Sequence, residues 1–185
     1  MLRRSLALAV AMLALSASLG IALRAAGAAT VTPAACAPKA PVELPYNSWP
    51  AARKELAPPG AAAIRLCRYN GLNTKPVRGL AAQALVSEPK AVAAIVRELD
   101  ALPKVPPGAI FSSVRRCPAG DGSIVDALIA YPGGQGVLVS IDLSGCLNVS
   151  NGNVTRMIGY GKNTKPGNAL LATVKRLTHW KRSDF

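Results

Sequence analysis

Apolar side chains recur every three or four residues in two stretches of the chain, which predicts two amphipathic helices. The first stretch contains Val92, Ile95, Val96, Leu99 and Leu102. Ser87 is expected to cap its N-terminus, Pro89 is tolerated in the first turn, and Pro103 is expected to stop it. The second stretch covers residues 168–180 and would form the last element of the chain.

Alternating apolar and polar residues between turn residues predict a set of strands. The expected strands cover residues 62–69, 79–86, 110–116, 123–131, 136–142, 145–150 and 153–158. Residues 132–135 are typical of a turn, and Asn151-Gly152 is a strong hairpin signal, so neighbouring strands should pair antiparallel. The order of elements predicts an α+β fold, mainly an antiparallel sheet. One helix would lie between strands and one at the C-terminus, both on one side of the sheet.

Residues 1–28 have the three parts of a secretory signal peptide. Arg3 and Arg4 precede an apolar run over residues 5–23, and Ala26-Gly27-Ala28 provides the small residues that a signal peptidase requires. Cleavage is expected before Ala29. The alternative is an uncleaved anchor helix, because the run is about the minimum length that spans a bilayer. Both interpretations place the rest of the chain outside the cytoplasm, secreted or associated with the cell envelope.

Residues 29–60 carry seven prolines and little periodicity, which predicts a Pro/Ala-rich arm or linker. Within this segment, residues 48–56 are expected to form a short helix, with Pro50 in its first turn. Residues 61–185 are expected to form a single domain, because their length suits one hydrophobic core.

Basic residues outnumber acidic residues by 22 to 9, which gives a formal net charge of +13. A basic exported protein is attracted to anionic material, so we expect anionic envelope polymers or an extracellular protein as partners. Sequence-specific nucleic-acid binding is not expected, because the few aromatic–basic pairs do not make a stacking platform. Contact with a membrane is expected only if residues 1–28 remain attached.

The four cysteines are Cys36, Cys67, Cys117 and Cys146. An even number in an oxidising compartment predicts two disulfides, for which three pairings exist. Folding the hairpin at residues 132–135 pairs residues whose numbers sum to about 267, which brings Cys117 and Cys146 to the same end of one strand pair. Cys36 then joins Cys67. The chain has no C-x-x-C spacing and a single histidine, so we expect no metal site and no cofactor.

No set of side chains in the sequence makes a convincing catalytic group. His179, the only histidine, is expected to cap the last helix. The predicted hairpin places Asp126 opposite Ile141 and diagonal to Asp142, and two close carboxylates would suit acid–base chemistry on a sugar. Asp121 and Asp142 also suit turns, since each is followed by glycine-containing sequence. We therefore assign no catalytic residue.

Three short motifs point to relatives. They are Leu66-Cys67-Arg68-Tyr69, Cys117-Pro118-Ala119-Gly120-Asp121-Gly122-Ser123, and Ser144-Gly145-Cys146 with Asn151-Gly152 following. Through these motifs residues 61–156 resemble a group of small exported actinobacterial proteins of unknown function. The resemblance implies an extracytoplasmic, disulfide-bonded domain, and it implies no activity.

We therefore expect an exported, non-catalytic domain that binds a partner in the cell envelope or outside the cell. The first alternative is a secreted inhibitor of an extracellular hydrolase, with Gly133-Gly134-Gln135 or the loop around Lys104 as its contact region. The second alternative is a weak hydrolase that uses Asp126 and Asp142.

Overall fold

The computed structural model describes residues 31–42, 47–105, 120–158 and 165–179. Its elements are η1, a 3-10 helix (Ala51–Arg53), β1 (Ala63–Tyr69), β2 (Leu80–Val86), α1 (Pro89–Asp100), β3 (Ile124–Ala130), β4 (Gly136–Asp142), β5 (Asn148–Ser150), β6 (Thr155–Met157) and α2 (Lys165–Leu177). All of them belong to one compact unit, Val31–Phe185. The predicted signal peptide and the predicted strand 110–116 lie outside the described residues.

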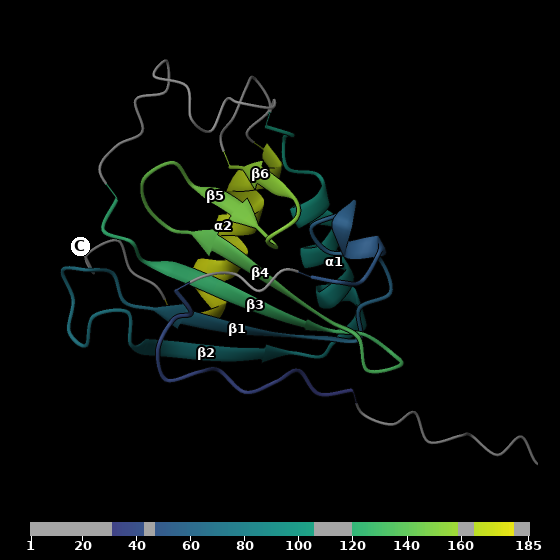
Figure 1. Cartoon of the computed structure of the whole chain (residues 1–185), viewed down its shortest axis with the longest axis horizontal. Coiled ribbons are helices and arrows are strands. Elements are labelled where there is room, and N and C mark those ends of the chain that lie inside the picture. Colours follow the sequence, from purple (N-terminus) through teal and green to yellow (C-terminus); the bar gives the residue numbers. More distant parts are fainter. Residues whose placement is uncertain (1–30, 43–46, 106–119, 159–164, 180–185) are drawn as a thin grey trace, which may run out of the picture. The chain divides into compact units, whose positions relative to one another are not determined.

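The six strands form one sheet in the order β2-β1-β3-β4-β5-β6, and every neighbouring pair is antiparallel (Figure 1). The expected α+β fold with a mainly antiparallel sheet is confirmed. The two edge strands differ in length, because β2 has seven residues and β6 has three.

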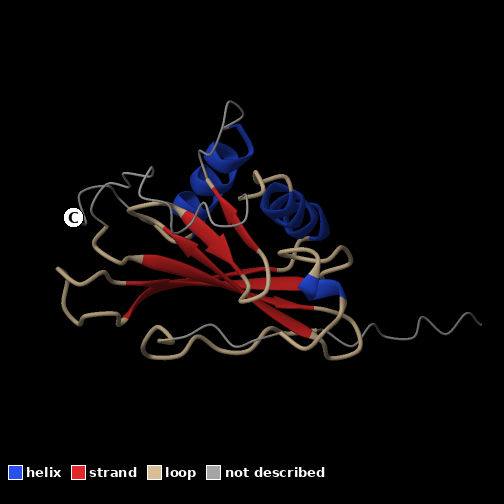
Figure 2. Ribbon diagram, turned by 45° about the horizontal axis from the view of Figure 1, so that its top comes forward, coloured by secondary structure: helices blue, strands red, loops and turns tan. Residues whose placement is uncertain are grey.

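Both helices cover one face of this sheet, which we call the helix face (Figure 2). The strand side chains on this face are almost wholly buried: Ile64, Leu66, Val125, Ala127, Ile129, Val137, Val139 and Ile141. Each helix turns an apolar stripe towards them, with Val92, Ile95 and Leu99 from α1 and Leu170 and Val174 from α2. Burial of each aliphatic side chain stabilises the fold by roughly 1.5–3 kcal/mol relative to full exposure. No helix in the described part of the chain has the length and apolar character that crossing a bilayer requires.

Residues 31–42 of the N-terminal arm lie against the opposite face of the sheet, which we call the arm face (Figure 2). The arm has a first limb, residues 31–42, and a second limb, residues 47–60; residues 43–46 between them are not described. The strand side chains on the arm face include Cys67, Tyr69, Asp126, Leu128, Leu138 and Ser140, since these positions alternate with the core positions of the helix face.

The second limb ends in the hydrophobic core, where Ala52, Leu56 and Ala57 have no exposed surface. The amide nitrogen of Asn151, itself 1% exposed, donates to the carbonyls of Ala52, Glu55 and Leu56 at 2.8, 2.9 and 3.2 Å. These carbonyls converge on one side chain instead of following a helix axis. This explains why the short helix predicted for residues 48–56 is only the single turn η1.

The N-cap of α1 is Glu88, so the prediction of Ser87 is wrong by one residue. Proline at the first helical position favours an extended residue before it, and Glu88 is extended, with φ −71° and ψ 122°. Its carboxylate accepts hydrogen bonds from the backbone N–H groups of Lys90 and Ala91 at 3.0 and 2.6 Å. The last helix also differs from the prediction of residues 168–180, because α2 begins at Lys165 and ends at Leu177.

The β3–β4 hairpin was expected to pair Asp126 with Ile141, and this register is wrong by one residue. Asp126 faces Ser140, and Ala130 faces Gly136, so the loop contains five residues instead of four. Two glycines with positive φ, Gly133 at 84° and Gly134 at 83°, make the turn. Because side chains alternate between faces, the corrected register puts Asp126 and Asp142 on the same face of the sheet.

Candidate functional site

A groove of about 470 Å³ lies on the arm face, between the two limbs of the arm. Its floor consists of residues 128–130 of β3 and 136–138 of β4. Its walls are residues 32–34 of the first limb and residues 47–48 of the second, and Gly134 and Gln135 of the hairpin turn also line it. We refer to this hollow as the arm groove.

The arm groove is chemically neutral, because none of its lining residues carries a charge. Pro33, Leu128 and Leu138 offer apolar surface, while Thr32, Ser48 and Gln135 offer hydroxyl and amide groups. Its volume is in the range of ligand-binding clefts. The combination suits an uncharged ligand, or a few residues of an extended peptide with uncharged side chains.

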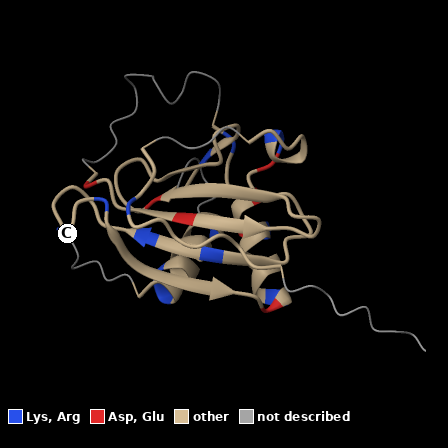
Figure 3. Cartoon of the chain, turned by 60° about the horizontal axis from the view of Figure 1, so that its bottom comes forward, with Lys and Arg blue, Asp and Glu red and all other residues tan. Residues whose placement is uncertain are grey.

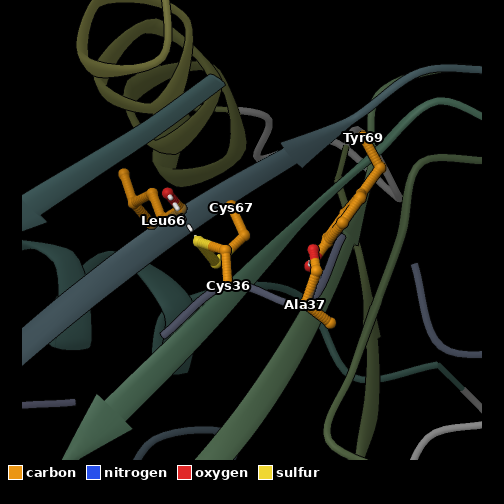
Figure 4. Close-up of a disulfide and its surroundings, with 5 residues drawn as sticks. All are labelled: Cys36, Ala37, Leu66, Cys67 and Tyr69. Carbon is orange, nitrogen blue, oxygen red and sulfur yellow. Dashed lines mark hydrogen bonds between the residues drawn. A yellow bond between two sulfur atoms is a disulfide. The ribbon is translucent and has the colours of Figure 1, made fainter. Parts of the chain in front are cut away.

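The first limb is held down by the Cys36–Cys67 disulfide, which joins it to the middle of β1 (Figure 4). The S–S distance is 2.00 Å and the two Cα atoms are 5.7 Å apart. The Tyr69 hydroxyl donates to the carbonyl of Ala37 at 3.2 Å. Beyond this point Lys39 forms a one-residue antiparallel bridge with Gly79, just before β2. The predicted Cys36–Cys67 pairing is therefore confirmed.

The second predicted disulfide involves Cys146, which is disulfide-bonded. Cys117 lies outside the described residues, so its pairing with Cys146 stays a prediction.

The second limb is fixed by side-chain amides and by an aromatic pair. The Asn47 side chain donates to the carbonyl of Gly136 at 3.1 Å, and Asn153 donates to the carbonyl of Asn47, also at 3.1 Å. The ring of Trp49 meets the ring of Tyr131 edge to face, with centroids 4.8 Å apart. These contacts fix the wall that the second limb contributes to the arm groove.

Asp126 lies on the arm face beside this groove, between Cys67 of β1 and Ser140 of β4. Only 1% of its surface is exposed, and its Oδ1 atom has no hydrogen-bond partner among the described residues. Burial raises the pKa of Asp126 to about 6, although the Ser140 hydroxyl and the charge of Arg78 lower it. The Asp126 carboxyl group is thus buried, and it is a weaker acid than an exposed aspartate.

The same face of β4 carries Asp142, two residues beyond Ser140, where it faces Ile124. Asp142 is half-buried, and its carboxylate accepts a hydrogen bond from the backbone N–H of Asn148 at 3.2 Å. The two carboxyls are diagonal neighbours, as the hydrolase hypothesis required. However, Asp126 is only 1% exposed, so a substrate can reach it only if the residues that cover it move.

Asp121 accepts a local network of hydrogen bonds, and this network joins two of the motifs found in the sequence. Its Oδ1 accepts hydrogen bonds from the Ser123 and Ser144 hydroxyls at 2.7 and 2.6 Å and from the Ser123 N–H at 2.9 Å. Burial raises the pKa of Asp121, but these bonds outweigh it and leave the pKa below its usual value. Gly71 packs against the same residue, since an added Cβ would lie 2.6 Å from the Asp121 carbonyl oxygen. We interpret this network as structural.

The residues proposed for an inhibitory surface lie at two separate places. Gly133, Gly134 and Gln135 are exposed at the tip of the β3–β4 hairpin. Lys104 is exposed after α1, where its backbone forms an antiparallel bridge with Arg156 of β6. His179 follows the last helix with a φ of 52°, and no catalytic partner lies beside it in any described contact. Figure 3 shows that the basic residues are spread over several elements.

Sequence reasoning missed the return of the arm and the residues that hold it. Asn47, Asn151 and Asn153 each make hydrogen bonds to backbone groups almost 100 residues away in the chain. Asn151 had been interpreted only as a hairpin residue. Its polar character beside an apolar strand was the available signal, but a single side chain cannot indicate which distant carbonyls it will meet.

Among the described residues, no group of histidine, cysteine or acidic side chains could hold a metal ion. Comparisons with models of protein families, with curated proteins and with solved structures found no match to this chain.

Proposed function

We propose that this chain is an exported, non-catalytic domain that binds a partner at the cell envelope or outside the cell through the arm groove. The observation that carries the proposal is the neutral groove between two fixed limbs of the arm. The walls are built by a disulfide, backbone bridging and side-chain amides, so the groove exists before its ligand arrives. A preformed site loses less conformational entropy on binding than a mobile one does.

The location outside the cytoplasm rests on the signal-like N-terminus and on the resemblance to exported actinobacterial proteins. The Cys36–Cys67 disulfide is compatible with that location, because such bonds persist in oxidising compartments. The basic charge has a separate role in the proposal. It attracts anionic envelope polymers over the whole surface, whereas the neutral groove selects an uncharged segment of the partner.

The test uses two adjacent alanines of the first limb, both exposed. Ala34 lines the arm groove and Ala35 does not. The secreted protein is immobilised and exposed to an envelope fraction and to secreted proteins, at low and at high salt. We expect a component that stays bound at high salt, that Ala34→Trp loses and that Ala35→Trp retains. If all bound material elutes as salt rises, charge alone explains the binding and the proposal fails.

Inhibition of an extracellular protease is the second candidate, and the position of Lys104 favours it. The Lys104 side chain is exposed, and its backbone is fixed by the bridge to β6. A trypsin-like protease binds such a basic side chain in its acidic specificity pocket. Micromolar protein should then inhibit such a protease, and Lys104→Ala should abolish the effect while Lys90→Ala, an exposed lysine of α1, should not. Equal inhibition by both variants would exclude Lys104 as the contact.

A further inference from the structure

The outer edge of β2 is an unusual edge strand. It has seven residues, Leu-Ala-Ala-Gln-Ala-Leu-Val, without a charge, a proline or a glycine. Its exposed side chains include Leu85, of which 51% is accessible. Natural sheets protect their edges with short strands, lysines, prolines or covering segments, because an open edge pairs with other strands.

The opposite edge of the same sheet shows that protection. β6 is three residues long and contains Arg156, and Lys104 bridges to it from the segment after α1. At β2 the arm provides cover only at the beginning, where the N–H of Leu80 donates to the carbonyl of Pro38. From residue 81 onward, no described segment lies in the bridging position along this edge.

The direction of the free backbone groups follows from these contacts. The Leu80 N–H and the Arg78 carbonyl point outward to the arm, whereas the Gly79 carbonyl accepts from Asn70 on the side of β1. In an antiparallel strand the N–H and C=O of one residue point to the same side, and successive residues alternate.

The register shift between Arg68 and Tyr69 adds one residue, Ala81, to β2 and interrupts this alternation. Tyr131 and Ser123 bond to β4, so the even-numbered residues of β3 face β1 and the even-numbered residues of β1 face β2. The residues of β2 that bond to β1 are therefore Ala82, Ala84 and Val86, whereas Gln83 and Leu85 present their backbone groups to solvent.

We propose that this edge pairs with the same edge of a second copy of the chain, antiparallel and about a two-fold axis at Ala84. In that register Ala84 faces its own equivalent, and Ala82 of each copy faces Val86 of the other. Gln83 of each copy then faces Leu85 of the other in a hydrogen-bonded pair, so the free backbone groups of both residues are used. The part of the edge that the arm occupies is not involved. A two-fold contact requires a self-complementary patch, which this arrangement provides.

The side chains fit the same arrangement. At the axis the two alanines leave room for the backbones to approach. On the arm face, Gln83 of each copy faces Leu85 of the other, so the exposed leucine is covered. The protein carries a net charge of +13, and its copies repel one another over most of their surface, but this strand contributes no charge to that repulsion. The result is a continuous sheet through two copies, and it does not depend on the arm groove.

The experiment compares the two glutamines of the chain in the secreted, oxidised protein. Gln83 is exposed on β2, and Gln135 is exposed in the β3–β4 turn. Changing either one to lysine adds the same charge, so the two variants differ only in where that charge lies. Sedimentation velocity over micromolar to sub-millimolar concentrations should show a dimer for the wild type and for Gln135→Lys. Gln83→Lys should associate more than about ten-fold more weakly, because it brings like charges together at the pairing edge. Thermal unfolding of both variants checks that each is folded.

Amide hydrogen exchange gives a second readout that does not need a variant. At high protein concentration the N–H groups of Gln83 and Leu85 should be protected, and dilution should release them. The N–H groups of Ala82, Ala84 and Val86 should stay protected at every concentration, because they face β1. A protein that stays monomeric, or a dimer that Gln83→Lys leaves intact, would overturn the proposal. So would alternate amides that become protected only when a strand of another protein is added, since that result assigns the edge to a different partner.

Discussion

Replacing Asp126 with asparagine should make the protein more stable at neutral pH. The carboxyl group is 1% exposed, and burial raises its pKa from 3.8 to about 6. A difference of this size between the folded and unfolded states corresponds to about 3 kcal/mol at any pH where both states are ionised. Asparagine has nearly the same shape and no charge, so Asp126→Asn removes this destabilisation without emptying the site.

The sign of the effect fixes the pH range in which it appears. Below about pH 3.8 the carboxyl is protonated in both states and the charge has no effect. Between 3.8 and about 6 the unfolded state ionises first, so the wild type loses stability as pH rises. Above about pH 6 both states are ionised and the loss is complete. Asp126→Asn should therefore match the wild type near pH 3.5 and exceed it by about 3 kcal/mol at pH 7.

The assay is urea unfolding followed by tryptophan fluorescence, to which Trp49 contributes; this residue packs against Tyr131 and should respond to loss of the fold. The half-buried acids whose pKa values are also raised by burial, Glu98, Asp100 and Asp142, are present in both proteins, so their effects cancel in the difference. Ser140→Ala gives a second comparison, because it removes a hydroxyl that lowers the pKa of Asp126; the loss of stability should then continue to a higher pH. A variant Asp126→Asn that is less stable than the wild type at pH 7 would refute the reasoning, since the charged form would then have to be favoured in the fold.

Three further changes test other parts of the structure. The double variant Cys36→Ser, Cys67→Ala removes the disulfide, whose cysteines are separated by 31 positions. It should lower the free energy of unfolding by about 3–4 kcal/mol in the chain-entropy model. Limited proteolysis should then cut the freed arm after Lys39, while the rest of the protein resists cleavage. Asn151→Ala leaves three carbonyls and two N–H groups without their partner, so it should lower the free energy of unfolding by roughly 2–4 kcal/mol. The control Asn153→Ala loses one hydrogen bond and should lower it by about 1 kcal/mol. Gly71→Ala should destabilise by about 1–3 kcal/mol, because its Cβ would meet backbone 2.6 Å away, whereas Gly136→Ala, with its nearest contact at 3.6 Å, should change the melting temperature little.

Much of the fold could be predicted because it depends on local patterns. The spacing of Val92, Ile95 and Leu99 defines α1, and alternation defines β3 and β4 to within a residue. The turn glycines set the hairpin, but the loop length was read as four residues instead of five, and this moved the partner of Asp126 from Ser140 to Ile141. A change of one residue in the loop shifts the strand register, and residue propensities do not determine the loop length to within one residue.

The candidate site could not be predicted in the same way. The arm has no periodicity, so its sequence does not indicate that it crosses the sheet and returns. Cys36 was the one residue of the first limb with an identifiable partner, because pairing by elimination pointed to Cys67. Asn47 forms a groove wall through its hydrogen bond to the carbonyl of Gly136, 89 positions away, and nothing in its local sequence encodes that contact.

The disulfide of the arm joins the two cysteines that come first in the chain. A polypeptide that is made and exported from its N-terminus exposes Cys36 and then Cys67 before either of the other two cysteines. If the chain is exported, as we propose, an oxidant outside the membrane meets the native pair as the first pair available, and no non-native bond has to be exchanged to reach it. The arm can be tethered to the future β1 while β3 and β4, the floor of its groove, have yet to emerge. The sheet would then assemble under a segment that is already in place.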